Sequence, residues 1–169
     1  MSLLSAARRV AKLLKQTNHK IVFAESCTAG LVATSLSRIP GISAWHCGGM
    51  VTYRNETKTA YLGIEPKILK RPGPVSEVVA RKMAEGVLSK TPEATLAASI
   101  TGHLGPNAPA KLDGVVYVAI AVRRAAGGSA STAFKFVLSP ECDRHERQKL
   151  AAEMLLTLVA DLLSAESQP

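Results

Sequence analysis

The sequence predicts an α/β protein, a three-layer α/β/α sandwich around a mostly parallel sheet. Segments with an apolar residue at every third or fourth position, typical of helices, alternate with short runs rich in β-branched residues, typical of strands. Two of these runs flank a turn sequence at 125–129 and predict a hairpin, which adds one antiparallel pairing. No internal repeat or linker interrupts the 169 residues, so we expect a single domain, 1–169.

The first four elements are predicted by their periodicity and by the residues that end them. Residues 3–14 place apolar side chains on one side and basic side chains on the other, as in an amphipathic helix. The apolar run 20–24 predicts a strand, and 28–37 predicts a second helix that a proline-glycine pair ends. The strand expected at 44–53 contains two consecutive glycines, which mark a bulge or a close approach of another group.

Capping residues and breakers predict the middle of the chain. A short helix over 55–62 is expected to end at Gly63, because glycine adopts the left-handed conformation that closes many helices. Three prolines and a glycine within 65–74 predict a loop. A serine suited to capping begins the helix expected over 76–90, and a strand follows at 94–101.

The last part of the chain combines a long loop, the hairpin and a long helix. Glycines and prolines predict a loop at 102–114, before a nearly all-apolar strand at 115–123 and its hairpin partner at 131–138. The last helix is expected over 139–164, with a proline at the tolerated first turn. Residues 165–169 are expected to fray.

Composition indicates an aqueous and reducing environment. Hydrophobic residues make up 47% of the chain, but no apolar run approaches the roughly 20 residues that span a bilayer, so we expect no membrane contact. The N-terminus lacks the basic and apolar regions of a signal peptide. Three scattered cysteines argue against a disulfide framework and against a zinc site. These observations predict a cytoplasmic protein.

The charge balance indicates the class of partner. The net charge is +8, from 21 Lys and Arg against 13 Asp and Glu, which favours anionic partners. The basic residues are spread along the chain and only 4% of residues are aromatic, so the stacking platforms of nucleic-acid binding are not indicated. We therefore expect a small anionic molecule rather than nucleic acid. Apolar, alanine-rich helix faces such as 150–163 favour a homo-oligomer.

The most informative stretch is Ala-Glu-Ser-Cys-Thr-Ala-Gly at 24–30, which joins a predicted strand to a predicted helix. Open α/β sheets bind their ligands at such corners. Ser26 then stands beside the free backbone N–H groups of Cys27, Thr28 and Ala29. A hydroxyl next to unpaired donors is suited to acyl transfer. The alternative is that Ser26 only caps the helix.

A second cluster, Tyr-Arg-Asn-Glu-Thr-Lys at 53–58, follows the next strand and therefore lies at the same edge of the sheet. Lys58 acts as a base only if its neutral form is populated, which requires burial or a nearby positive charge. The alternative for Lys58 is a solvated helix residue. His103 follows the third strand at the same edge, and we interpret it as loop structure or a substrate contact rather than as the base, because no orienting acid is identifiable.

Several motifs together resemble the CinA C-terminal domain family. The motifs are Ala-Glu-Ser-Cys-Thr-Ala-Gly at 24–30, Pro-Gly at 40–41, Gly-Met-Val-Thr-Tyr-Arg-Asn-Glu-Thr-Lys at 49–58, Leu-Gly at 62–63, Val-Ser-Glu at 75–77 and Thr-Gly at 101–102. The first two are specific in combination. The resemblance extends from about residue 21 to the last helix, and the chain is similar to the short form of the family, which lacks a larger N-terminal domain.

The resemblance implies a five-stranded mixed sheet and a nicotinamide-mononucleotide (NMN) amidohydrolase, an enzyme of NAD salvage. Such an enzyme hydrolyses the carboxamide of NMN to the acid and ammonia, without a metal or other cofactor. The family's nucleophile falls on Ser26, its basic lysine on Lys58 and its motif tyrosine on Tyr53. The residues expected to bind the substrate are Glu25, Cys27, Thr28, Ala29, Gly30, Asn55, Thr101, Gly102, His103, Gly105 and Lys111.

One stretch departs from the family pattern. Where the pattern has a pair of glycines, this chain has Ala108 and Pro109, and Pro109 has no N–H to offer to a phosphate or ribose. His103 and Asp113 add groups that the pattern does not contain. The alternative function is therefore a non-catalytic nucleotide-binding or regulatory module with the same fold.

Overall fold

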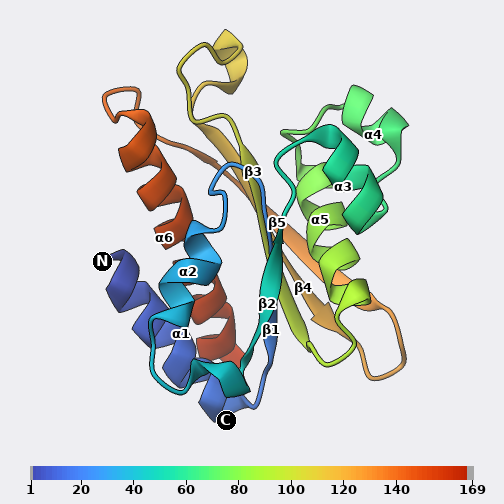
Figure 1. Ribbon diagram of the computed structural model, residues 1–169, viewed down its shortest axis with the longest axis vertical. Coiled ribbons are helices and arrows are strands. Elements are labelled where there is room, and N and C mark those ends of the chain that lie inside the picture. The colour runs from blue at the N-terminus through green and yellow to red at the C-terminus, as the bar shows by residue number, and fades with distance from the viewer. Residues whose placement is uncertain (1, 167–169) are drawn as a thin grey trace.

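Five strands form one sheet in the computed structural model, which describes residues 2–166 (Figure 1). From one edge of the sheet to the other, the strands are β2 (His46–Val51), β1 (Ile21–Glu25), β3 (Leu96–Gly102), β4 (Val115–Arg123) and β5 (Ser129–Val137). The fold class and the five-stranded mixed sheet expected from the sequence are confirmed.

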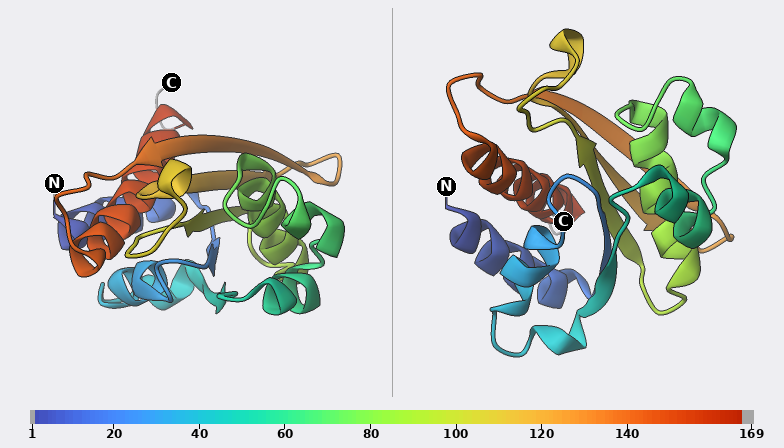
Figure 2. Two further views of the ribbon diagram at one scale, coloured as in Figure 1. Left: turned by 90° about the horizontal axis from the view of Figure 1, so that it is seen from above. Right: turned by 45° about the horizontal axis from the view of Figure 1, so that its top comes forward.

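Helices cover both faces of this sheet. The helices are α1 (Leu3–Thr17), α2 (Leu31–Ser37), α3 (Asn55–Leu62), α4 (Pro66–Lys70), α5 (Glu77–Lys90) and α6 (Arg144–Glu166), with short 3-10 turns η1 (Ile42–Ala44) and η2 (Ala110–Leu112). Helices α1, α2 and α6 lie on one face, and α3, α4 and α5 lie on the other (Figures 1 and 2). The arrangement is the three-layer sandwich that the sequence predicts. No helix within residues 2–166 has both the length and the apolar character needed to cross a bilayer.

The sheet contains two antiparallel pairings rather than the one expected from the hairpin. β4 runs antiparallel to β3 as well as to β5, while β1 is parallel to both β2 and β3. The reason is that the loop after β3 returns the chain from the same edge at which β3 ended, so β4 has to run backwards. The carboxyl ends of β1, β2 and β3 therefore meet at one edge of the sheet.

One additional helix and the starts of two others differ from the sequence-based expectation, and α1 continues to Thr17 rather than ending at 14. Residues 66–70 form α4 within the expected loop, because Pro66 sits at the tolerated first position and Leu69 is buried. α6 begins at Arg144 rather than at 139, since Asp143 and Glu146 cap it reciprocally: each backbone N–H donates to the other's carboxylate, at 2.9 and 2.8 Å. α2 starts at Leu31 rather than at 28, for a reason given below.

Smaller differences affect the strand ends and the C-terminus. β2 is shorter than expected because η1 takes up its beginning, and β5 starts two residues earlier than expected. The fraying expected at 165–169 is wrong for 165 and 166, which continue α6, and residues 167–169 lie outside the described residues. Gly63 ends α3 in the left-handed conformation, and Ser76 caps α5, both as predicted.

Each face of the sheet buries its own apolar cluster, because successive strand residues point to opposite faces. In β1, Phe23 packs with the cluster under α1, α2 and α6, whereas its neighbour Val22 packs with the cluster under α5. Both side chains are almost fully buried. The two clusters fix the sheet between its helix layers and thereby fix the edge where β1, β2 and β3 end.

Gly86 sets how closely α3 approaches α5. A Cβ placed on Gly86 would lie 2.5 Å from the carbonyl oxygen of Leu62, the last residue of α3. The contact is with backbone, so a side-chain rotation cannot relieve it. Because Lys58 lies one turn before Leu62 on the same helix, this approach also sets the position of Lys58.

We predict that Gly86→Ala lowers the free energy of unfolding by about 1–3 kcal/mol, the usual cost of overpacking. Helix propensity alone predicts the opposite, a gain of about 1 kcal/mol. Thermal or urea unfolding of the two proteins decides between the two effects. An unchanged or raised melting temperature for Gly86→Ala would contradict the close packing of α3 on α5.

Candidate active site

The turn after β1 presents Ser26 at the carboxyl edge of the sheet. Ser26 N–H donates to the carbonyl of Ile100 in β3 at 3.0 Å, and Ala29 N–H donates back to the carbonyl of Ser26 at 3.1 Å. Ala29 and Gly30 both have positive φ, 53° and 96°. Two left-handed residues in succession are incompatible with a helix, so α2 begins only at Leu31 and the turn stays open around Ser26.

The carboxylate of Glu25 holds this turn in place. Glu25 is only 2% exposed, and its two oxygens accept hydrogen bonds from the backbone N–H groups of Gly30, Val32 and Ala33 at 3.0, 3.1 and 2.9 Å. An anion at the start of α2 also interacts favourably with the helix dipole. The structure therefore places Glu25 in a cap of α2, whereas the sequence interpretation grouped it with the substrate-binding residues.

Lys58 reaches Ser26 from the opposite side of the sheet. Its Nζ atom lies 3.0 Å from Ser26 Oγ and donates to the carbonyl of Thr52 at 2.7 Å. Lys58 is only 1% exposed. The alternative that Lys58 is a solvated helix residue is therefore wrong. The end of β2 is itself tied to β1, because Thr52 N–H donates to the carbonyl of Glu25 at 2.8 Å.

Burial gives Lys58 the proton affinity of a base that works near neutral pH. Desolvation lowers the pKa of Lys58 from 10.5 to about 8, against a smaller opposing effect of Cys27. A lysine with this pKa is partly neutral at pH 7 to 8, and only the neutral amine has a lone pair to accept a proton. The pair formed by Ser26 and Lys58 is therefore a candidate nucleophile and base.

The neighbouring thiol is an unsuitable nucleophile. Burial raises the pKa of Cys27 to about 12, although its own backbone N–H partly offsets the effect. The thiolate, which is the reactive form, is therefore scarce at neutral pH. Ser26, which contacts Lys58, is the better candidate although Cys27 is adjacent in the chain.

The pair opens into a cavity of about 290 Å³. Of the residues predicted from the sequence, those that line the cavity are Ser26, Cys27, Tyr53, Asn55, Lys58, Thr101, Gly102 and His103. The structure thus brings together side chains from the ends of β1, β2 and β3, as the common edge of the sheet predicts. Pro74, Val75, Leu104 and Arg144 complete the lining.

Tyr53 lies at the rim of this cavity rather than against the serine and lysine. It is 54% exposed, and its hydroxyl accepts a hydrogen bond from Arg144 Nη2 at 2.8 Å. Arg144 also donates to the carbonyl of Gly105. Sequence reasoning missed Arg144, since it is 91 residues from Tyr53 and no local motif marks it. It arrives at the site only because the capped start of α6 lies there.

The remaining predicted residues lie outside this cavity. Thr28 is buried in the turn, where its carbonyl accepts from Gln148 Nε2 at 3.3 Å and its hydroxyl lacks a partner among the described residues. Gly105 lines a neighbouring cavity. Lys111 lies in η2, is exposed and does not line the cavity beside Ser26. Within residues 2–166, no group of three His, Cys, Asp or Glu side chains is arranged to hold a metal ion.

The turn supplies donors for a developing oxyanion. Of the three N–H groups predicted from the sequence, that of Ala29 is occupied by the carbonyl of Ser26. Within residues 2–166 the N–H groups of Cys27 and Thr28 have no backbone acceptor, which makes these two groups the candidate donors in this turn. Fixed backbone donors of this kind stabilise the negative charge of a tetrahedral intermediate.

Known proteins resemble this chain over most of its length. Residues 4–163 match the family model described as the CinA C-terminal domain. A "CinA-like protein" of Chloroherpeton thalassium is 40% identical over 157 residues, which cover 92% of this chain and 37% of the relative. A second "CinA-like protein", from Trichormus variabilis, is 37% identical over 157 residues, 92% of this chain and 36% of the relative. The chain thus spans little more than a third of the length of these relatives.

Solved structures share the fold over nearly the whole chain. The competence/damage inducible protein CihA from Agrobacterium tumefaciens superposes with a TM-score of 0.81 at 30% identity, covering 98% of this chain and 96% of that one. The competence damage-inducible protein A from Klebsiella pneumoniae gives a TM-score of 0.87 at 23% identity, covering 97% and 98%. At that lower identity the likeness shows the fold alone.

We predict a pH dependence of stability that isolates Lys58. Between pH 8 and 10.5 the unfolded chain binds more protons at Lys58 than the folded chain, because folding lowers this pKa to about 8. The free energy of unfolding of the wild type, relative to Lys58→Met, should therefore rise with pH across this window. Below about pH 7 both states are mostly protonated, and the difference should be nearly constant.

Urea unfolding of both proteins at several pH values measures this difference. The other titratable groups are common to both proteins, so their contributions cancel to first order. A difference that does not change between about pH 7 and about pH 10 would show that Lys58 titrates at its ordinary pKa, against the burial described above.

Proposed function

The chain belongs to the family of CinA C-terminal domains. We propose that it is an amidohydrolase in which Ser26 and Lys58 form the catalytic pair. Its proposed substrate is nicotinamide mononucleotide or a related nucleotide amide. The observation that carries the proposal is the buried contact of 3.0 Å between Lys58 Nζ and Ser26 Oγ. A lysine excluded from water and placed against a serine hydroxyl is equipped to remove its proton.

In the first half of the reaction, neutral Lys58 takes the proton of Ser26 as Oγ attacks the carboxamide carbon. The negative charge that develops on the amide oxygen is stabilised by the N–H groups of Cys27 and Thr28. The protonated Lys58 then gives its proton to the leaving nitrogen. The C–N bond breaks, ammonia departs, and the acyl group remains on Ser26.

In the second half, water replaces ammonia in the site. Lys58, again neutral, takes a proton from this water as it attacks the acyl carbon, and then returns the proton to Ser26 Oγ as the ester bond breaks. The carboxylic acid leaves and the pair is restored. Throughout, the carbonyl of Thr52 accepts from Lys58 Nζ at 2.7 Å and keeps the amine directed toward Ser26.

The charge of the cavity supports an anionic substrate. Among its lining residues, Arg144 carries a permanent positive charge and none is a carboxylate. Arg144 forms hydrogen bonds with two neutral groups, the hydroxyl of Tyr53 and the carbonyl of Gly105, and within residues 2–166 it has no ion pair with a carboxylate. A phosphorylated amide fits such a cavity better than a neutral or cationic amide.

We predict that the purified protein releases ammonia from NMN and that Ser26→Ala and Lys58→Ala each reduce the rate about a thousandfold or more, since each removes one half of a unit. The matched controls are Ser37→Ala and Lys90→Ala, which change the same residue types at exposed positions. Both controls should retain the wild-type rate. Full activity in Ser26→Ala would remove Ser26 from the mechanism.

The same assay separates the enzyme from a non-catalytic nucleotide-binding module. If NMN binds to the wild type but no ammonia appears, the module is the better description. If turnover occurs, kcat/KM should increase with pH up to about 8 and then level off, because the base has to be neutral and burial lowers the pKa of Lys58 to about 8.

A further inference from the structure

Gln148, at the start of the second turn of α6, contacts the turn that carries Ser26. Its side-chain nitrogen Nε2 lies 3.3 Å from the carbonyl oxygen of Cys27 and 3.3 Å from that of Thr28. Carbonyl oxygens only accept hydrogen bonds, so the atom that faces both of them has to be the NH2 group of the amide. Gln148 does not line the cavity beside Ser26, and the mechanism above does not use it.

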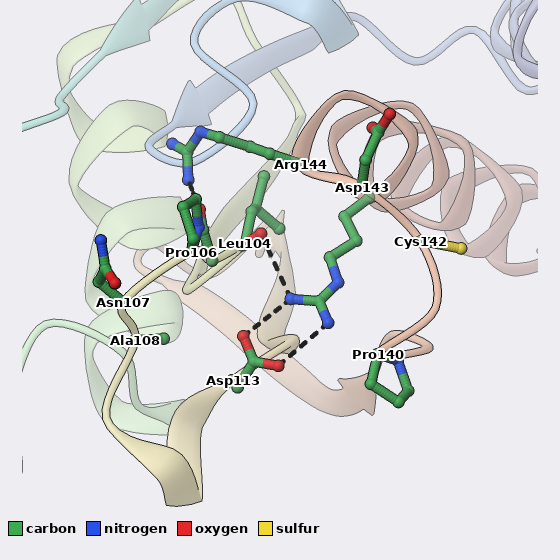
Figure 3. Close-up of a pocket in the computed structure, with 11 residues that line it drawn as sticks. Leu104, Pro106, Asn107, Ala108, Asp113, Pro140, Cys142, Asp143 and Arg144 are labelled. Carbon is green, nitrogen blue, oxygen red and sulfur yellow. Dashed lines mark hydrogen bonds and ion pairs between the residues drawn. The ribbon is translucent and has the colours of Figure 1, made fainter.

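The residue before Gln148 anchors this part of α6 without its help. Asp113, on the loop after β3, points toward α6, and Arg147 contacts both of its carboxylate oxygens at 2.8 and 3.0 Å (Figure 3). The same guanidinium donates to the carbonyl of Ser139 at 3.0 Å, and Arg147 is only 4% exposed. A bidentate pair of this kind defines a geometry. The backbone of Gln148 is therefore held next to the turn whatever its side chain is.

The first contact of Gln148 fixes the direction of a candidate oxyanion donor. The Cys27 carbonyl and the Thr28 N–H belong to one peptide unit, which is trans, so the two bonds point in opposite directions. A donor that holds this carbonyl toward α6 therefore also directs the Thr28 N–H away from Gln148. Acceptance of a hydrogen bond at the carbonyl also makes the N–H of the same peptide a better donor, because linked hydrogen bonds polarise one another.

The second contact of Gln148 holds the next peptide unit. The Thr28 carbonyl shares this unit with the N–H of Ala29, which donates to the carbonyl of Ser26 at 3.1 Å and closes the turn. One amide group thus holds two successive peptide units of the turn. The N–H of Thr28 lies between these two contacts in the chain.

We propose that Gln148 is a positioning residue, which directs the Thr28 N–H at the oxyanion that forms beside Ser26. The inference rests on the proposed function, which places a tetrahedral intermediate at Ser26 Oγ. Gln148 contacts neither the substrate nor the reacting atoms. Its effect falls on the transition state, because the negative charge on the amide oxygen develops only as Oγ attacks.

Steady-state hydrolysis of NMN separates this role from substrate binding. Gln148→Ala should lower kcat about tenfold and leave KM within about twofold, because the oxyanion contact is stronger in the transition state than in the bound substrate. Outright loss of an oxyanion donor lowers kcat about a hundredfold or more, and a donor that is only less well directed should have a smaller effect. Gln148→Met, which keeps the length of the side chain without its N–H groups, should behave like Gln148→Ala.

Matched variants distinguish positioning from a role in folding. Gln16 is exposed in the last turn of α1, and Gln16→Ala should change neither kcat nor KM. Gln148→Arg returns N–H donors to the position and should recover most of the lost kcat, which restored packing alone would not explain. If kcat is the same in Gln148→Ala, Gln148→Met and Gln16→Ala, or if only KM changes, the proposal is wrong.

A serine-directed probe gives a result that does not depend on NMN. Pyridine-3-boronic acid forms a tetrahedral adduct when Ser26 Oγ bonds to boron and Lys58 takes the hydroxyl proton. The adduct is an anion, and one of its hydroxyl oxygens then occupies the place of the oxyanion. Boron NMR measures its affinity. Gln148→Ala should bind the probe about tenfold more weakly than Gln16→Ala, and Ser26→Ala should form no adduct.

The two measurements distinguish failure of this inference from failure of the proposed function. A weaker adduct in Gln148→Ala without ammonia release from NMN by the wild type would count against the proposed substrate but would support the role of Gln148. Ammonia release with the same kcat and the same probe affinity in Gln148→Ala would support the reaction and overturn the role of Gln148. No adduct with the wild type would overturn it as well, since the turn would then offer no oxyanion site.

Discussion

The contact between Lys58 Nζ and Ser26 Oγ is the interaction on which the candidate site depends, and it exists only because a lysine is held away from water. Desolvation of an ammonium group is unfavourable, so the buried lysine does not stabilise the fold. The apolar clusters on the two faces of the sheet provide the stability that tolerates it. The stability of the apolar clusters thus offsets the cost of burying Lys58 at the edge where three strands end.

Three features of the surrounding chain keep Lys58 Nζ and Ser26 Oγ at this distance. Glu25 caps α2 and thereby fixes the turn that carries Ser26. The carbonyl of Thr52, anchored through its own N–H to β1, binds the amine of Lys58. Gly86 lets α3 approach α5 and so sets the height of Lys58 above the sheet. The turn after β1, the end of β2 and the packing of α3 on α5 therefore all contribute to the distance between Lys58 Nζ and Ser26 Oγ.

The first turn of α6 fixes the loop that follows β3 next to the site. Arg144 and Arg147 lie one turn apart, and both bind the loop that follows β3. Arg147 is neutralised by Asp113 and serves the frame, whereas the charge of Arg144 faces the cavities. One helix end thus supplies both a structural arginine and a candidate binding arginine, and the difference between them is the presence of a carboxylate partner.

The sequence predicted the layers, most strands and the common edge, because hydrophobic periodicity and strand ends are local features. It also predicted which strand ends meet, and the resemblance to a family assigned roles to Ser26 and Lys58. It did not predict α4, since three prolines and a glycine outweighed the burial of Leu69. Arg144 and the cap formed by Glu25 were missed because both depend on contacts between segments that only the folded chain brings together.

The most direct test of the account is the pKa of Lys58 itself. Titration of its Nζ atom by heteronuclear NMR, assigned by comparison with Lys58→Met, reports the protonation of this one amine. We predict a midpoint near pH 8, because burial lowers the pKa of Lys58 to about 8. A midpoint near the ordinary value of 10.5 would mean that the amine is charged at neutral pH and cannot serve as the base for Ser26.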